Sequence, residues 1–389
     1  MIHLYCKTLV RFRCSSVLDS KIHKLYALQT HPLSSSLKSI STSTNQHSFT
    51  VNYLLNSCGL SPETAISASK YINLKTLDNP DSVLNFFKNH DFSKTQISAV
   101  IRLRPKLLLS DPMKALLPKF DFFYSIGISS TELAKIVSTD PSMLLHSLEN
   151  QIIPSVNLLK NLLNSEDKFI VAFKRFPQIV VRDLNAVTFP NIEILRQQGV
   201  SESNILYLLT YQPRSLAIKH DGFNELVEDV KKMGFNPSSF KFIWAIHALR
   251  SMSKSTWKRK MEVYEKWGWS EEETMSAFRR RPGCMMVSEE MIMAKLNFYV
   301  KTMGWESSSI AHHSELMTIS LGKKIIPRCS VLQVLLSKGL IKKPNSELTL
   351  LKPKESLFLK KFVNCYEEAS QLLKLYREKL ELSKLHGHD

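Results

Sequence analysis

Arginine and lysine side chains cluster around prolines in this chain, at positions where they could bind phosphate groups. Five windows, each centred on a proline, read IRLRPKLLL (101–109), VSTDPSMLL (137–145), FKRFPQIVV (173–181), LTYQPRSLA (209–217) and FRRRPGCMM (278–286). In every window but the second, which has Asp140, a cation lies within three residues of the proline. These cations are Arg102, Arg104, Lys106, Lys174, Arg175, Arg214, Arg279, Arg280 and Arg281. A cation that recurs once per unit can meet the regularly spaced phosphates of a nucleic acid.

Two further basic clusters lie outside the windows. We expect them to contribute phosphate contacts as well, from Lys258, Arg259, Lys260, Lys323, Lys324 and Arg328. Each cation taken alone has a structural alternative, because a basic side chain at a helix end also favours the helix dipole. Phosphate contacts position a nucleic acid without reading its sequence, and no base-reading residue stands out. Trp244 could stack on an unpaired base, whereas Trp269 and Trp305 directly follow glycines, where a packing role is expected.

The composition favours an anionic partner. The 389 residues carry 52 Lys and Arg against 35 Asp and Glu, which gives a formal net charge of +17. Such an excess is typical of proteins that bind nucleic acid, although it also aids solubility or organelle import. No run of 18 or more apolar residues is present, so we expect no membrane span. We expect the protein to act as a monomer.

Catalytic motifs are absent from the sequence. It contains no GxxxxGK, HExxH or GxSxG motif and no CxxC pair. His312, His313 and Glu315 suggest a metal site, but adjacent residues on a helix point in different directions, which disfavours shared ligation. We therefore expect no metal, no cofactor and no enzymatic activity.

The basic windows belong to an internal repeat. Pro105, Pro141, Pro177 and Pro213 follow one another at intervals of 36 residues, and Pro282 continues the series. A second series of prolines lies 13 residues behind the first, and Ser314 takes the place of proline in a late unit. A third series consists of a glycine, an apolar residue and a small polar residue, and its glycines include Gly127, Gly199, Gly234, Gly268 and Gly304. A period of this length indicates a solenoid.

Local signals divide each unit into helix, short apolar turn and helix. The pairs Ser93–Gln96, Ser129–Glu132 and Ser270–Glu273 form capping boxes that begin a helix after the glycine. The proline ends that helix because the residue before it is pushed out of the α region. A second helix then ends at the next glycine in a left-handed conformation. The sequence thus predicts an all-α, curved helical-repeat solenoid of about eight units. The unit near residue 246 lacks its proline, and the glycine slot near Leu163 is empty.

The combined pattern resembles the repeat of the mitochondrial transcription termination factor (mTERF) family, and plant organellar members in particular. The resemblance covers roughly residues 50–342 and is closest in SCGLSPETAISAS (57–69), NPDSVLNFFKNHDFSKTQI (79–97) and WKRKMEVYEKWGWSEEE (257–273). It implies stacked helices bent into an arc, with nucleic acid on a basic concave face. It also implies a role in organellar transcription termination or initiation, or in RNA maturation such as splicing. Ser314 in a proline slot and Lys295 in place of a second proline depart from the pattern.

The two ends of the chain differ from the repeats. Residues 1–48 hold ten serines and six Lys or Arg but only one acid, Asp19, which is typical of an organelle transit peptide. Without them the chain keeps 46 Lys and Arg against 34 Asp and Glu, a net charge of +12. We therefore expect a transit peptide over 1–48, the repeat array over 49–342 and a helical cap or tail over 343–389. The early LVRFRC segment favours a mitochondrion, with a chloroplast as the alternative.

Two functions remain open on the sequence. The first is a non-enzymatic factor that binds organellar DNA or RNA, and that works beside transcription, splicing or ribosome proteins. The second is a helical-repeat scaffold that docks on an organelle ribosome or polymerase. The first expects basic residues gathered on the concave face, whereas the second expects them dispersed.

Overall fold

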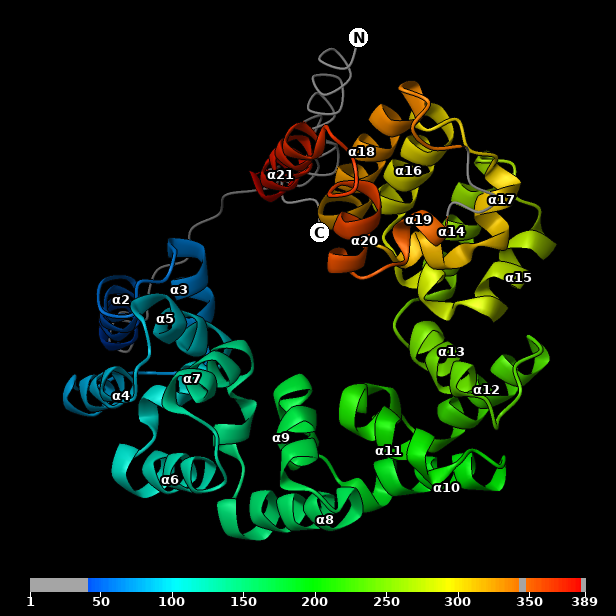
Figure 1. The fold of residues 1–389 in the computed structure, drawn as a ribbon. Helices are drawn as coiled ribbons and strands as arrows, with labels where there is room; N and C mark the ends of the chain where they lie inside the picture. The colour runs from blue at the N-terminus through cyan, green and yellow to red at the C-terminus, as the bar shows by residue number, and fades with distance from the viewer. Residues whose placement is uncertain (1–40, 343–347, 386–389) are drawn as a thin grey trace, which may run out of the picture.

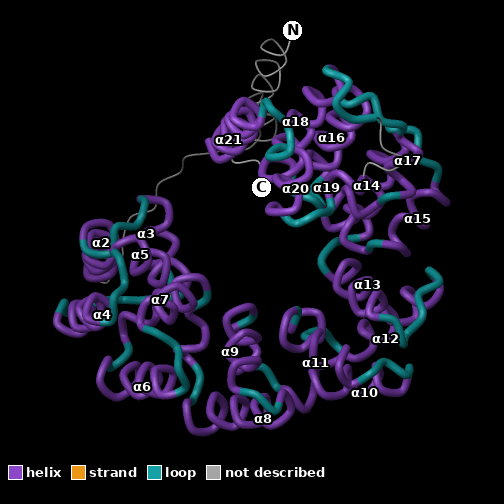
Figure 2. Tube along the Cα trace, viewed as in Figure 1, coloured by secondary structure: helices purple, strands orange, loops and turns teal. Residues whose placement is uncertain are grey.

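The computed structural model describes residues 41–342 and 348–385, and these form a curved array of paired helices (Figure 1). None of the described residues forms a strand, as the colouring of Figure 2 makes clear. The predicted all-α solenoid is confirmed. Within the described ranges no helix is long and apolar enough to cross a membrane. Most of the predicted transit peptide lies outside the described residues, and residues 41–48 begin the helix α2.

Each repeat has a first helix, which starts after the glycine and ends at the proline, and a second helix. The first helices are α3 (Pro62–Ser69), α5 (Lys94–Leu103), α7 (Ser130–Thr139), α9 (Glu166–Arg175), α11 (Glu202–Tyr211), α13 (Phe240–Arg250), α15 (Glu271–Arg280) and α17 (Ser307–His312). The second helices are α4 (Asp78–Asn89), α6 (Leu117–Ser125), α8 (Ile153–Leu163), α10 (Phe189–Gln197), α12 (His220–Lys232), α14 (Lys254–Lys266), α16 (Glu289–Asn297) and α18 (Ile326–Ser337), and α2 (Ser41–Asn56) precedes them. The chain ends in α19 (Leu348–Leu351), α20 (Glu355–Phe362) and α21 (Ala369–Leu385).

The five proline windows form short 3₁₀ turns, as their sequences predict. The turns span Pro105–Leu109, Pro141–Leu145, Pro177–Val181, Pro213–Leu216 and Pro282–Met286, and Ser314–Thr318 forms the same turn without a proline. Buried leucine, isoleucine, valine or methionine side chains in each turn join the core. The three predicted capping boxes are present at Ser93, Ser129 and Ser270.

The residues with a left-handed backbone conformation also follow the predicted series of glycines, and at two places another residue stands in for glycine. Gly127 and Gly268 have φ of 87° and 85°, which a side chain rarely adopts. Asp91 takes the same region at φ 65°, and Asn164 at φ 46° ends α8 next to the slot that lacks a glycine. Asparagine and aspartate tolerate this conformation better than other residues do.

The second helices start earlier than their prolines indicate. Wide π-helical turns precede α6, α8, α10 and α18, over Pro112–Leu116, Leu148–Ile152, Leu184–Thr188 and Leu321–Ile325. Each second proline therefore lies where the wide turn passes into the α-helix. Proline has no N–H to donate and its ring crowds the carbonyl four residues back, and the wider turn accommodates both effects.

The unit near residue 246 has lost its turn altogether. α13 runs without interruption from Phe240 to Arg250, through the stretch where the other units break. From α3 to α13 the first helices lie toward the inside of the arc and the second helices on its rim (Figure 1). Beyond α13, in the same view, α14, α16 and α18 lie nearer the inside. The row of first helices therefore winds around the arc.

Candidate nucleic-acid interface

The residue before each turn has a similar backbone conformation, outside the α region. Arg104 has φ −142° and ψ 73°, and Arg281 has φ −145° and ψ 87°. Asp140, Phe176 and Gln212 hold the corresponding places in three units between them, with φ from −148° to −138°. The proline that comes next disfavours the α region for this residue. The break in each repeat thus presents one equivalent side chain after another along the array.

The first basic window is open to solvent. Arg102, Arg104 and Lys106 are exposed, and they line a cavity of about 620 Å³ together with α3 and Tyr71. Arg104 donates to the adjacent carbonyl of Leu103 at 2.9 Å, whereas no other group of the described chain engages Arg102 or Lys106. These cations are available to an anionic partner.

The two cations of the third window are exposed but already have partners. Lys174 forms a 2.5 Å ion pair with Glu132, whose pKa is lowered by this contact and by the bonds from Ser129. Arg175 donates to the Tyr211 carbonyl at 3.2 Å and lies 5.6 Å from the centre of the tyrosine ring. These contacts join α9 to α7 and α11, and a phosphate would have to compete with Glu132 for Lys174.

Phe176 takes the third of the five positions that directly precede the proline of a window, where Arg104 and Arg281 stand in other units. Arg214 and Arg182 both lie over its ring, at 5.4 Å and 5.3 Å from the ring centre. Arg214 nevertheless remains exposed at its turn. A guanidinium stacked on a ring keeps its donors available at its edge, so Arg214 can still meet a phosphate.

The triple arginine has one member without a partner. Arg279 pairs with Glu272 at 2.5 Å, and Arg280 donates to the Ala311 carbonyl at 2.8 Å. Arg281 is exposed, and within the described residues it makes no hydrogen bond or ion pair. Arg280 and Arg281 line a second cavity, of about 650 Å³, between α13 and the turn that follows α15. Only Arg281 is fully available to a ligand.

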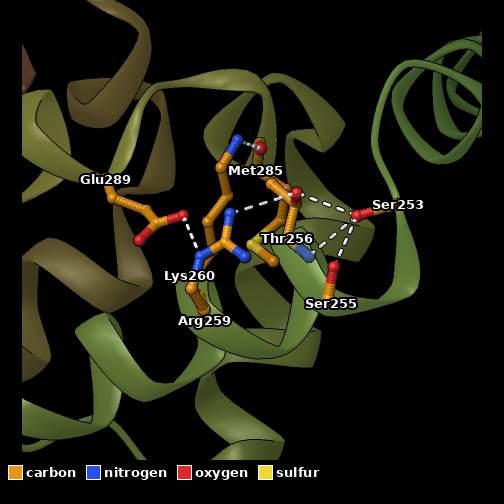
Figure 3. A network of polar contacts seen from close by, with 7 residues as sticks. All are labelled: Ser253, Ser255, Thr256, Arg259, Lys260, Met285 and Glu289. Carbon is orange, nitrogen blue, oxygen red and sulfur yellow. Dashed lines mark hydrogen bonds and ion pairs between the residues drawn. The ribbon is translucent and has the colours of Figure 1, made fainter. Parts of the chain in front are cut away.

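Two of the cations predicted to contact phosphate are buried in the structure. Lys260 is 6% exposed and donates to the Met285 carbonyl at 2.7 Å, as Figure 3 shows. Arg328 is 1% exposed, donates to the carbonyls of Leu351 and Pro353, and lies over the Phe358 ring. Both cations are buried and bonded to backbone carbonyls, so they are not available to a phosphate.

The neighbours of Lys260 face other directions. Lys258 is exposed, while Arg259 forms an ion pair with Glu289 at 2.9 Å and contacts Thr256 (Figure 3). Successive residues on a helix point about 100° apart, so a run of three cations cannot share one face. The run KRK thus supplies one surface cation without a partner, one paired cation and one buried cation.

Near the C-terminal end, the basic cluster is partly covered by the last helices. Lys323 is exposed, whereas Lys324 is half-buried and donates to the Lys352 carbonyl at 3.4 Å. Burial lowers the pKa of Lys324, and the nearby Arg328 lowers it further. Lys323 stays an expected phosphate contact, and Lys324 is a poorer one.

The buried cations belong to a series of inter-repeat hydrogen bonds that the sequence analysis missed. In each, a side chain of a second helix donates to a backbone carbonyl of a turn or short helix 22 to 25 residues later. The pairs are Lys119–Leu144, Asn191–Leu216, Lys260–Met285, Lys295–Met317 and Arg328–Leu351. The signal was present in the sequence, because Lys119, Asn191 and Arg328 directly follow the second prolines.

Aromatic residues beside the two cavities were also missed. Tyr71 is 64% exposed at the first cavity and Phe240 is 44% exposed at the second. Phe240 continues a row of rings, with Tyr207 at 4.8 Å and Trp244 at 6.4 Å between ring centres. The interface therefore offers flat apolar surfaces next to cations.

The comparisons with known proteins place this arrangement in one family. The mTERF family model matches residues 84–250 and 247–359. The two matches meet within the last turn of α13, the helix that has lost its break. The comparison with curated proteins gives no match. Since the two family matches together span most of the chain, the protein belongs to the mTERF family.

Proposed function

We propose that the protein is a non-enzymatic nucleic-acid-binding factor that regulates gene expression in an organelle, through transcription or RNA maturation. The observation that carries this proposal is a set of exposed cations that have no strong partners. They lie beside the 3₁₀ turns at the prolines and on α14. These are Arg102, Arg104, Lys106, Lys258 and Arg281. Membership of the mTERF family and the net charge of +17 support the same function.

Phosphate binding by these cations has a defined signature. Each neutralised phosphate releases condensed counterions, so the logarithm of the binding constant falls by about 0.9 for each contact per decade of salt on duplex DNA. Five contacts give a slope of roughly −4 to −5. The test is a fluorescence-anisotropy titration of the purified protein with duplex and single-stranded oligonucleotides over a salt series. A slope near zero, or no binding at 50 mM salt, would contradict the proposed function.

We further propose import into the mitochondrion through residues 1–48, and action as a monomer beside the organelle's transcription, splicing or ribosome proteins. The segment's basic, serine-rich and acid-poor composition supports import. A fusion of residues 1–48 to a fluorescent protein tests the address. Fluorescence that coincides with a mitochondrial dye is expected, and coincidence with chlorophyll would assign the plastid instead.

A further inference from the structure

The cavity between α13 and the turn Pro282–Met286 combines a flat apolar wall with cations. Its volume of about 650 Å³ lies within the range of small-ligand sites. Phe240 and Trp244 supply the aromatic surface, and Met286 and Pro282 add apolar surface. The unbroken α13 packs directly on this turn, which brings the aromatic residues of its first two turns beside the arginines at the end of α15.

The cationic side of this cavity has unused hydrogen-bonding capacity. Lys241 and Arg281 are exposed, and neither side chain has a partner in the described parts of the chain. Arg280 also lines the cavity, and its buried Nε–H has no hydrogen-bond partner among the described residues. An anionic ligand with a flat ring would satisfy both sides of the site.

The first cavity lies at the equivalent place five repeats earlier. Arg104 directly precedes Pro105 as Arg281 precedes Pro282, and Tyr71 supplies the exposed ring that Phe240 supplies in the later unit. The far walls also correspond, because Leu145 and Thr318 each lie four residues after the start of the following turn. Two cavities that join an exposed ring to the arginine before a proline therefore occur on one winding row, and the first of them also has Glu63 in its lining.

The units between the two cavities differ from them at the residue that directly precedes the proline. Asp140 is acidic and accepts a hydrogen bond from Gln178. Phe176 is covered by Arg182 and Arg214, and Gln212 carries no charge. In the sequence, arginine directly precedes a proline only at Arg104 and Arg281. The array thus has two cationic, aromatic sites separated by units whose corresponding positions are acidic, filled or neutral.

We propose that these two cavities bind unpaired nucleotides of one strand, with the base against Phe240 or Tyr71 and the phosphate at Arg281 or Arg104. A nucleotide joins a flat ring to an anion, which is the chemistry that both cavities offer. A paired base must be unstacked and flipped out of the duplex before it can enter such a cavity, which costs a few kcal/mol, so the sites favour single-stranded segments or loops. A strand long enough to reach both sites gains effective concentration at the second site. This inference rests on the proposed nucleic-acid-binding function.

The test compares variants of the full chain on matched single-stranded and duplex oligonucleotides at one salt concentration. Phe240→Ala removes a half-exposed stacking surface, and its matched control is Phe49→Ala, a similarly exposed phenylalanine on α2. We expect Phe240→Ala to weaken single-strand binding about ten-fold, as loss of one base–aromatic stack does, and to change duplex binding less than two-fold. Phe49→Ala should leave both unchanged, and circular dichroism establishes that each variant is folded.

Further arms of the experiment separate the contributions. Arg281→Gln should weaken single-strand binding, whereas Lys266→Gln at the exposed C-terminal end of α14, outside the lining of the cavity, should not. RNA and DNA strands of the same sequence distinguish the two sources of the ligand, and adenosine monophosphate as competitor tests whether a free nucleotide suffices. A series of strand lengths should show a step in affinity when one strand reaches both sites, and Tyr71→Ala should remove the step.

The outcomes distinguish this inference from the proposed function. Salt-dependent binding that is unaffected by Phe240→Ala, or weakened equally for duplex and single strand, would overturn the inference and leave the function standing. Absence of any nucleic-acid binding by the unmodified protein would overturn both.

Discussion

The Nζ atom of Lys260 donates to the carbonyl oxygen of Met285 across 2.7 Å of the protein interior. This bond ties α14 to the turn of the next repeat, and the lysine stem packs within the core while its head satisfies a buried acceptor. Burial lowers the pKa of Lys260, so the bond is formed at a cost in desolvation.

Removing this donor should destabilise the array. Lys260→Met keeps the length of the side chain but leaves the Met285 carbonyl unpaired, which costs about 1–2 kcal/mol in free energy of unfolding. Lys258→Met on the exposed face of the same helix should change the stability by less than about 0.5 kcal/mol. Denaturant unfolding followed by circular dichroism measures both. Equal stability of the two variants would mean that the inter-repeat bond contributes nothing.

The stability should depend on pH through Lys295. Burial lowers the pKa of Lys295 to about 8, from an ordinary value near 10.5. Between these pH values the unfolded chain binds more protons at this site, so the contribution of Lys295 to the free energy of unfolding rises with pH. From pH 8 to pH 9 the unmodified protein should gain about 1 kcal/mol relative to Lys295→Met.

The measurement compares the two proteins at each pH rather than following one alone. Buried Cys284, whose pKa is raised to about 12, acts in the opposite direction above pH 9, and the comparison cancels it. Lys301→Met, at an exposed position, serves as the control. A constant difference between the proteins from pH 7 to pH 9 would contradict the burial of a titrating amine.

Gly268 should resist substitution for a conformational reason alone. Its φ is 85°, and a Cβ atom placed there would meet no atom within 4 Å. Gly268→Ala should therefore cost about 1–2 kcal/mol from backbone strain, without steric contribution. Asn164→Gly, at a left-handed position with φ 46°, should cost far less or stabilise the protein. Thermal unfolding of the two variants provides the check, and an unchanged midpoint for Gly268→Ala would refute the left-handed assignment.

The salt dependence of nucleic-acid binding should change when individual phosphate-binding cations are replaced. Replacing Arg102 and Lys106 together by glutamine should reduce the magnitude of the salt slope by about 2, because two phosphate contacts are lost. Lys260→Met should not alter the slope, since this cation is buried. Anisotropy titrations at four salt concentrations suffice, and a slope that responds to Lys260 but not to Arg102 and Lys106 would place the nucleic acid elsewhere.

The repeat architecture could be predicted because its determinants are local. Proline before a buried apolar triplet and serine three residues before glutamate act within one turn of chain, and they predicted the turn Pro141–Leu145 and the start of α7 correctly. The left-handed conformation of Asn164 was not predicted, although the glycine series indicated that a glycine is missing near Leu163. Local backbone preferences thus sufficed for the order and type of the helices.

The candidate site was less predictable because its determinants are tertiary. Lys260 and Arg328 carry the same charge as their exposed neighbours, and only the packing of a later turn or of α19 distinguishes them. Phe240 escaped notice because the unit near residue 246 lost its proline, which left the phase of the repeat uncertain there. A cation's role in this fold depends on which carbonyl lies 22 to 25 residues further along the chain.

The inter-repeat hydrogen bonds give the array a polarity. Every donor of the series lies N-terminal to its acceptor, so deleting a unit from the C-terminal end leaves an amine, amide or guanidinium donor of the remaining protein without its acceptor. Deleting a unit from the N-terminal end uncovers only a carbonyl group, which water can reach at the new terminus. The short helix α19 therefore caps the C-terminal end of the array, because it supplies the acceptor for Arg328, the last donor of the series. Loss of α19 would leave the buried Arg328 without this acceptor, so we expect unfolding from this end to begin there.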